Sequence, residues 1–274
     1  MKIDLHTHSD RSDGTDSPTE LVENAKAAGL DVIAITDHDS TEGWKEADKV
    51  AKRVGITLVH GIEISTKLGG KSVHLLGYEF DPRHKALNVE LRKVIDGRNS
   101  RLPATLDRLQ KLGIDITADH VRARSTNAAA TGRPHVADAL IDLGVVKDRN
   151  EAFERYLKPG RPAYVDRYAA DLQIAIGLVK AAGGKAVLAH PWSRGSHRVL
   201  TRDRIGALAD LGLDGLEVDH NDHGAEDRAA LRQIAREFGL VWTGSSDYHG
   251  TGKIDFPLGG NTTEPGQYRQ LLDR

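Results

Sequence analysis

The chain contains no cysteine and few aromatic residues. Its 274 residues include no Cys, one Met and only 5% Phe, Trp and Tyr. The absence of cysteine excludes disulfides and thiolate metal ligands, and it is typical of proteins of a reducing compartment such as the cytoplasm. Any metal chemistry must therefore use imidazole and carboxylate ligands, and the chain has 13 His and 40 Asp and Glu residues.

Long hydrophobic runs are also missing. No apolar run approaches the ~18 residues that a membrane-spanning helix needs, and the first residues, MKIDLHTHS, do not have the pattern of a signal peptide. The net charge is −2, whereas proteins that follow the phosphates of a long duplex are usually basic. We therefore expect a cytoplasmic protein with no membrane partner and no long duplex nucleic-acid partner.

Seven short apolar runs predict strands, which we expect to be buried and parallel. They are residues 2–5, 31–36, 56–64, 72–80, 185–191, 215–220 and 240–246. Helical patterns lie between most of them. The first begins with Ser17 as a plausible cap and Pro18 in the first turn, and it ends at Gly29. Alternating strands and helices favour a parallel α/β architecture, and seven strands are close to the number that closes a barrel.

One stretch interrupts this alternation. Residues 83–168 contain helical patterns and no convincing strand, including a long pattern around Pro103 that fits either one helix or a kinked pair. This stretch has 17 Lys and Arg against 11 Asp and Glu, a net charge of +6, and the rest of the chain has −8. We predict an inserted helical cap subdomain at 83–168 and a barrel domain made of 1–82 and 169–274. The charge contrast suggests an anionic ligand bound with the help of metal ions, with a solvated surface as the alternative.

Imidazoles and carboxylates recur at or near the ends of six of the predicted strands. His6 and His8 are two residues apart on one strand, so they face the same side, roughly 6.5 Å apart. The full set is His6, His8, Asp13, His38, Glu63, His74, His190, Asp247 and His249. In α/β barrels the carboxyl ends of the strands form the active site. Nine side chains of these types fit two or three ions such as zinc, manganese or iron.

Each of these residues has a simpler interpretation when it is taken alone. A single histidine near a strand end is more often a core or surface group, and a single aspartate is more often a helix cap. We interpret Asp39, or Ser40 beside it, as such a cap. Agreement among six strand ends by accident is improbable, and burying so many polar groups without metal would carry a large desolvation cost.

Six motifs occur in a fixed order along the chain. They are DLHTHSDRSDGT (4–15), AITDHD (34–39), GIEIS (61–65), HLLGY (74–78), AHP (189–191) and SDYH (246–249). Together they resemble the PHP (polymerase and histidinol phosphatase) family. The resemblance implies an α/β fold, a distorted (β/α)7 barrel of the PHP type, here with an inserted helical subdomain, and a centre of two or three divalent ions (Mn²⁺, Fe²⁺ or Zn²⁺). It implies one ion at His6, His8, Glu63 and Asp247, a second at Asp13, His38 and His249, and a third that shares Glu63 with His74 and His190.

The helical insert resembles one branch of this family. TGRPHVADAL (131–140) and YLKPGRPAYV (156–165) are similar to segments of enzymes that remove the 3′-phosphate from 3′,5′-bisphosphonucleotides. Some of their relatives also trim short RNA from the 5′ end. The resemblance implies phosphate contacts at Arg133, His135 and Lys158. Arg194, His220 and His223 are further candidates because they lie at or near strand ends. They are weaker ones, since such side chains usually belong to a solvated surface.

We therefore expect a metal-dependent phosphoesterase, a hydrolase that acts on small nucleotides and removes the 3′-phosphate of 3′,5′-bisphosphonucleotides, with 5′ trimming of short RNA as a secondary activity. Asp247, Glu63 and His190 are the predicted catalytic residues, with the two carboxylates bridging or nearly bridging the ions. The general acid stays open between His190, His223 and a metal-bound water. The alternatives are a phosphatase for histidinol phosphate or another small monoester, and a non-catalytic regulatory domain, although degenerate domains usually lose ligands.

Overall fold

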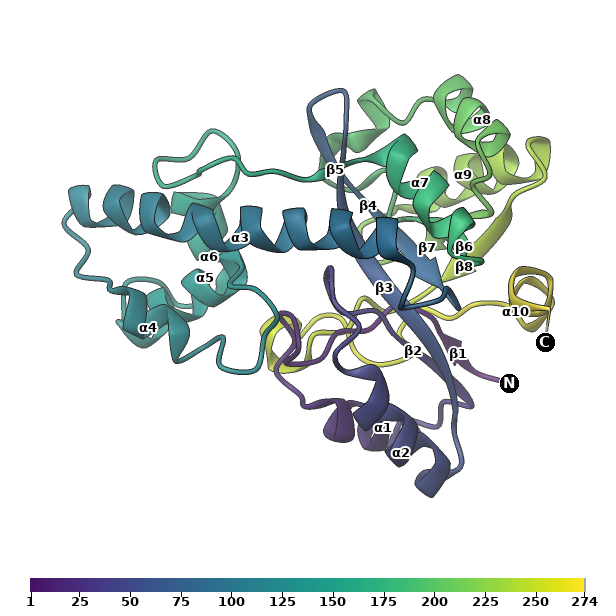
Figure 1. Ribbon diagram of the computed structural model, residues 1–274, viewed down its shortest axis with the longest axis horizontal. Helices are drawn as coiled ribbons and strands as arrows, with labels where there is room; N and C mark the ends of the chain where they lie inside the picture. Colours follow the sequence, from purple (N-terminus) through teal and green to yellow (C-terminus); the bar gives the residue numbers. More distant parts are fainter. Residues whose placement is uncertain (274) are drawn as a thin grey trace.

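Seven strands follow one another around a nearly closed barrel in the computed structural model, which describes residues 1–273 (Figure 1). Their order is β1-β2-β3-β4-β6-β7-β8, and a short β5 pairs with β3 outside this path. The two ends of the path meet after β1 and β8, where Thr7 forms a bridge with Tyr248 and the His8 amide donates to the Tyr248 carbonyl at 2.9 Å. This architecture confirms the predicted distorted barrel.

The elements follow the predicted runs closely. The strands are β1 (Ile3–Asp4), β2 (Val32–Ile35), β3 (Thr57–Leu68), β4 (Lys71–Tyr78), β5 (Ala170–Asp171), β6 (Lys185–Ala189), β7 (Gly215–Asp219) and β8 (Val241–Gly244). The helices are α1 (Pro18–Ala27), α2 (Trp44–Val54), α3 (Lys85–Lys111), α4 (Ala118–Arg122), α5 (Arg133–Asp142), α6 (Arg149–Ala152), α7 (Leu172–Ala181), α8 (Arg202–Asp210), α9 (Ala225–Glu237) and α10 (Pro265–Leu272). Three further short turns are the π-helical η1 (Phe153–Leu157) and the 3₁₀-helical η2 (Ser193–Arg198) and η3 (Gly250–Lys253).

The prediction that all seven strands are parallel was wrong for β4, which is antiparallel to both of its neighbours, β3 and β6. The reason is the connection before it. Only Gly69 and Gly70 separate β3 from β4, both have positive φ (54° and 77°), and a two-residue link can join only antiparallel strands. His74 therefore lies in the middle of β4, opposite Ser65 of β3 and Ala189 of β6. The reversal brings its side chain to the same end of the barrel as the other predicted ligands.

Two hydrophobic layers hold the barrel together. One fills its interior with residues such as Ile3, Val59 and Leu76, and the other packs the outer helices onto the strands. Helix α1 begins as predicted, because the Ser17 hydroxyl accepts from the Glu20 amide at 3.2 Å and the Glu20 carboxylate accepts from the Ser17 amide at 2.8 Å. Such a capping box satisfies amides that the first helical turn leaves unpaired.

The helices that follow β4 extend to one side of the barrel (Figure 1). Helix α3 is a single helix of 27 residues that continues through Pro103. Its first half packs on the barrel through Leu87 and Val94, whereas Leu109 and Leu140 belong to a separate hydrophobic cluster with α4, α5, α6 and η1. The helical lobe thus has a core of its own beyond the middle of α3, and the boundaries 83–168 stay a prediction.

Within residues 1–273, no helix combines the length and the apolar composition that crossing a bilayer requires.

Candidate metal centre and its cleft

The nine predicted ligands converge at the end of the barrel where β1, β2, β6 and β8 finish, and Glu63 reaches this end from the middle of β3. They supply three groups of side chains whose donor atoms lie within 4.8 Å of one another. The groups are His6, His8, Glu63 and Asp247; His8, Asp13, His38 and His249; and His38, Glu63 and His74. His190 lies beside the third group, with its Nε2 3.1 Å from Glu63 Oε1.

The first group is arranged around a shared point. The Nε2 atoms of His6 and His8 are 3.0 Å apart, and both lie 3.2–3.3 Å from Glu63 Oε2 and 3.4–3.5 Å from Asp247 Oδ1. All four side chains are buried. Two imidazole nitrogens and two carboxylate oxygens that face one another need a cation between them, so the donor set fits a divalent ion.

The second group contains polar atoms without partners. Asp13 Oδ1 and His38 Nδ1 are buried and form no hydrogen bond, although Asp13 Oδ1 lies 3.3 Å from His249 Nε2. His249 Nδ1 donates to the Asp247 carbonyl at 2.7 Å, which leaves its Nε2 free to act as a ligand. Buried polar atoms without partners are costly, and a bound ion would satisfy them.

Glu63 connects all of these side chains. Its Oε2 lies 3.1 Å from His38 Nδ1, and its Oε1 lies 2.6 Å from His74 Nδ1. The pKa of Glu63 is well below its usual range: burial opposes ionisation, but the facing histidines His74, His38 and His6 outweigh it. An ionised carboxylate at the centre of the cluster can contact more than one cation.

Protonation differs among the histidines of the cluster. Burial opposes the charged form of each, yet hydrogen bonds to Asp247 and Glu63 raise the pKa of His8 to about 9. Burial lowers the pKa of His190 to about 4, and burial together with Lys253 lowers that of His249 to about 4. Two of the ligand positions also have left-handed backbone, with φ of 28° at His190 and 54° at Asp247. Such conformations are uncommon outside glycine and concentrate at functional sites.

Strand β7 contributes two residues that the strand-end set does not include. Glu217 Oε1 accepts from His6 Nδ1 at 3.0 Å, and its Oε2 accepts from the His190 amide at 2.8 Å. His220, just after the strand, lies 3.4 Å from Asp247 Oδ2. Glu217 therefore fixes the orientation of the His6 ring. The sequence signal for Glu217 was a charged residue inside an otherwise apolar strand.

Two aspartates after β2 also support the centre. Asp37 accepts from the Ser9 amide at 2.8 Å and from the Ser12 hydroxyl at 2.6 Å, which orders the loop that carries Asp13. Asp39 is not a helix cap, and neither is Ser40, because α2 begins only at Trp44. Asp39 instead accepts from the Ser65 amide at 2.7 Å and from Arg98 Nε at 2.8 Å.

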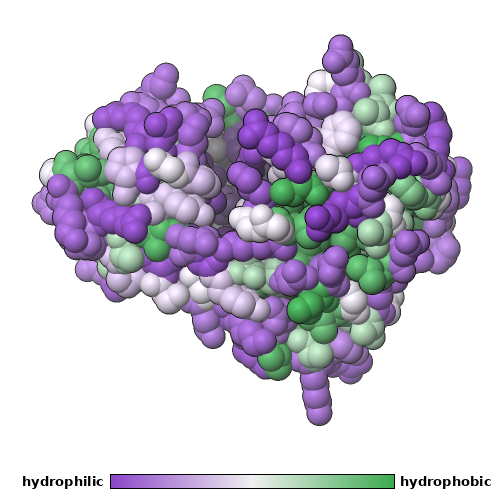
Figure 2. Space-filling model, turned by 90° about the horizontal axis from the view of Figure 1, so that it is seen from above, coloured by the Kyte–Doolittle hydropathy of each residue, from purple (hydrophilic) through white to green (hydrophobic). Residues whose placement is uncertain are grey.

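A cleft of about 360 Å³ lies between the ligand cluster and the helical lobe, and the surface in Figure 2 is hollowed between these two parts of the molecule. Of the residues predicted to bind substrate, Arg133, Lys158 and Arg194 line this cleft. His135 and His223 do not. His135 Nδ1 accepts from the Gly132 amide at 2.9 Å, and His223 bonds to the Val218 carbonyl and the Trp192 amide.

The cleft is rich in arginine. Arg98, Arg101 and Arg167, which the sequence motifs did not indicate, line it as well. Among residues 1–273, the guanidinium groups of Arg101, Arg133, Arg167 and Arg194 form no ion pair with a carboxylate. Burial and the neighbouring guanidinium groups lower the pKa of Arg101 to about 8, and burial and Arg194 lower that of Arg133 to about 10. Arg101 is buried, Arg133 and Arg167 are half-buried and Arg194 is exposed. Unpaired cations that line one cleft favour an anion in the space between them.

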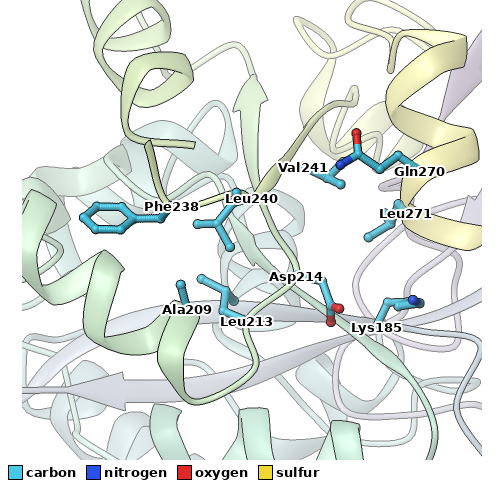
Figure 3. Close-up of a pocket in the computed structure, with 10 residues that line it drawn as sticks. Lys185, Ala209, Leu213, Asp214, Phe238, Leu240, Val241, Gln270 and Leu271 are labelled. Atoms are coloured by element: carbon cyan, nitrogen blue, oxygen red, sulfur yellow. The ribbon is translucent and has the colours of Figure 1, made fainter. Parts of the chain in front are cut away.

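A second pocket lies away from this centre. It measures about 330 Å³ and is lined by Leu213, Phe238 and Leu271 with Lys185 and Asp214 (Figure 3). Its lining residues lie where β6, β7 and β8 begin, at the barrel end opposite the ligand cluster. No histidine lines this second pocket, so it lacks the imidazole ligands of the cluster. The candidate active site is therefore the cleft.

Comparison with known proteins agrees with this geometry. The PHP domain model matches residues 4–97. The chain is 38% identical to a 5′-3′ exoribonuclease of Haemophilus influenzae, over 99% of this chain and 96% of that protein. It is 37% identical to a 3′,5′-nucleoside bisphosphate phosphatase of Chromobacterium violaceum, over 92% of this chain and 88% of that protein.

A solved structure extends the comparison to the whole fold. A Bifidobacterium adolescentis protein predicted to be a metal-dependent phosphoesterase superposes with a TM-score of 0.95 at 36% identity, over 99% of this chain and 95% of that one. The ligand cluster, the barrel and these relatives lead to one conclusion: the chain belongs to the PHP family and is a metal-dependent phosphoesterase, a hydrolase.

Proposed function

We propose that this enzyme removes the 3′-phosphate from 3′,5′-bisphosphonucleotides, with the ligand cluster acting on one phosphate and the arginines of the cleft binding the other. The observation that carries the proposal is the set of guanidinium groups at Arg101, Arg133, Arg167 and Arg194, which have no carboxylate partner among residues 1–273 and line the same cleft as the ligands. A substrate with two phosphates can satisfy both halves of that cleft at once.

The proposal assigns the divalent ions to the three groups of ligands. His6, His8, Glu63 and Asp247 would hold one ion, Asp13, His38 and His249 a second, and Glu63 and His74, with His190 beside them, a third. Manganese, iron and zinc all fit these ligand types. Ions held there would supply Lewis acidity toward a phosphoryl group and acidify water at neutral pH.

The protein's own residues do the remaining work. Glu217 fixes the ring of His6, and Asp37 fixes the loop that carries Asp13. His223 is a poor general acid because its Nε2 accepts from the Trp192 amide and its Nδ1 bonds to the Val218 carbonyl. Lys253, whose Nζ lies 2.7 Å from Asp247 Oδ2 and which lines the cleft, adds a positive charge beside the reacting phosphate.

The helical lobe, assigned here to residues 83–168, would provide substrate selection. Arg133 lies over the rings of Phe153 and Tyr164, at 5.5 Å from each ring centre, so the lobe holds this guanidinium in a fixed place. Histidinol phosphate, in contrast, carries an ammonium group that would face unpaired arginines. The cleft therefore favours the doubly anionic nucleotide over that monoester.

A second substrate has support from one relative. The Haemophilus influenzae protein is a 5′-3′ exoribonuclease, and short RNA also presents several phosphates to a basic cleft. We assign short RNA trimmed from its 5′ end as a further substrate of the same site. The lack of cysteine favours action in the cytoplasm.

The test is a phosphate-release screen in Mn²⁺ with 3′,5′-bisphosphonucleotides, mononucleotides, short RNA and histidinol phosphate. We expect the highest kcat/KM on a 3′,5′-bisphosphonucleotide, with release of the 3′-phosphate. A higher kcat/KM on histidinol phosphate or on a mononucleotide would overturn the assignment of the substrate.

A further inference from the structure

Arg149, the first residue of α6, forms a two-pronged ion pair with Asp138 of α5. Arg149 Nε lies 2.6 Å from Asp138 Oδ1 and its second terminal nitrogen 2.7 Å from Oδ2. The remaining terminal nitrogen donates to the backbone carbonyl of Asp13 at 3.1 Å. The side chain is only 11% exposed, so this arrangement is built into the contact between the helical lobe and the barrel.

The same guanidinium packs against the turn that follows His249. A Cβ atom placed on Gly252 of η3 would lie 2.3 Å from a terminal nitrogen of Arg149 and 2.6 Å from its central carbon. Real side chains do not approach so closely, which means that the backbone at Gly252 lies directly against the guanidinium. Arg149 thus contacts the Asp13 carbonyl on one side and the segment after His249 on the other.

Asp13 and His249 belong to one group of candidate ligands, with His8 and His38. Their side chains already face each other, with Asp13 Oδ1 3.3 Å from His249 Nε2. Arg149 holds the backbone segments of both, and Asp138 balances its charge, so the contact adds no unbalanced cation next to a bound metal. The contacts described for Arg149, with Asp138, the Asp13 carbonyl and Gly252, involve no side chain of the group formed by His6, His8, Glu63 and Asp247.

We propose that Arg149 is a positioning residue for the metal ion at Asp13, His38 and His249, and that it makes the occupancy of this ion depend on the docking of the helical lobe. This inference rests on the proposed metal centre. Residues that orient metal ligands are themselves important for affinity, and their loss typically weakens metal binding by about 10- to 100-fold. The expected loss of affinity is confined to one ion, because the only ligand segments that Arg149 contacts are the backbone segments that carry Asp13 and His249.

The experiment measures metal content and affinity rather than turnover. Wild type, Arg149→Ala and Arg124→Ala are stripped, reloaded with Mn²⁺ and compared by elemental analysis and by calorimetric titration. Arg124 is a matched control, because it forms a similar two-pronged pair with Asp142, one helical turn further along α5, but is about half exposed, and its guanidinium pairs with Asp142 rather than with a ligand segment. We expect Arg149→Ala to bind one ion about 10- to 100-fold more weakly, with the other ions unchanged and Arg124→Ala equal to wild type.

Wild-type affinity for every ion in folded Arg149→Ala would overturn the proposal. If Arg149→Ala does not fold, Gly252→Ala provides the test, because its methyl group displaces the guanidinium while the residue stays in place. Unchanged binding of all ions in Gly252→Ala would then overturn it. A wild-type protein that binds no ion at all would instead refute the metal centre and, with it, the proposed function.

Discussion

His6 and His8 direct their Nε2 atoms at each other across 3.0 Å, inside a buried cluster of carboxylates. Glu217 holds the other nitrogen of His6, so the facing nitrogens must share either a hydrogen or a metal ion. This pair links the protonation of the protein to its metal content, because a divalent ion takes the neutral imidazole and releases the proton.

Metal removal is the first consequence. We expect the reconstituted chain to hold two or three divalent ions, and we expect chelation to abolish phosphate release, because both the phosphoryl group and the attacking water depend on them. Elemental analysis and an assay with and without chelator check this. Fewer than one ion per chain after reconstitution, or full turnover in a chelator, would contradict it.

Replacing Asp247 by Asn should remove turnover and leave the fold intact. Asp247 lies 3.4–3.5 Å from both facing histidines, so the variant loses a charged ligand of that group. The measurement is kcat in Mn²⁺, with circular dichroism as the check on folding. A folded Asp247→Asn protein that keeps a tenth or more of wild-type turnover, with its metal bound, would show that Asp247 is not a catalytic ligand.

The metal-stripped protein should be most stable near pH 6.5. His190 and His249 have pKa values near 4 in the folded protein, below their ordinary 6.5. The unfolded chain therefore binds more protons between pH 4 and 6.5, and stability rises with pH there. The pKa of His8 is raised to about 9. The stabilisation that its bound proton gives to the folded protein is therefore complete below pH 6.5 and is lost as the pH rises to 9.

Urea unfolding at pH 5, 6.5 and 8.5 in the presence of a chelator tests this pH dependence. The expected free energy of unfolding is highest at pH 6.5. A continuous rise from pH 6.5 to 8.5 would show that His8 does not carry a stabilising proton.

Glu217→Gln should weaken metal binding without removing any direct ligand. The amide keeps the shape of the side chain but loses the negative charge that holds the His6 N–H. Loss of such an orienting partner typically costs about 10- to 100-fold in affinity. Competition with a chelator of known affinity measures it, and a Glu217→Gln protein with wild-type affinity would show that the His6 ring needs no such support.

The sequence predicted the barrel well where local patterns decide the outcome. Apolar runs and capping residues identified the seven strands of the barrel path and helices such as α1, and the motifs at their ends predicted a ligand set that the structure brings together. The direction of β4 could also have been predicted, because the adjacent Gly69 and Gly70 between two strand patterns are typical of a hairpin.

Other parts depend on contacts between distant segments. Arg98 and Arg101 on α3 resemble ordinary solvated arginines in sequence, and only the docking of the lobe turns both toward the cleft. Asp39 follows a strand as a helix cap would, but its partners Ser65 and Arg98 are 26 and 59 residues away. His135 and His223 carry suitable chemistry, yet local backbone groups occupy their ring nitrogens.

The most direct test compares wild type and Arg133→Ala on a 3′,5′-bisphosphonucleotide and on the 3′-monophosphate of the same nucleoside. A charge-assisted hydrogen bond contributes about 1.5–3 kcal/mol, so the variant should lose roughly 10- to 150-fold in kcat/KM on the bisphosphate. The loss on the monophosphate should be much smaller, because that substrate lacks the phosphate that Arg133 binds. Equal losses on both substrates would contradict a cleft that binds one phosphate with its arginines and cleaves the other at its metal centre.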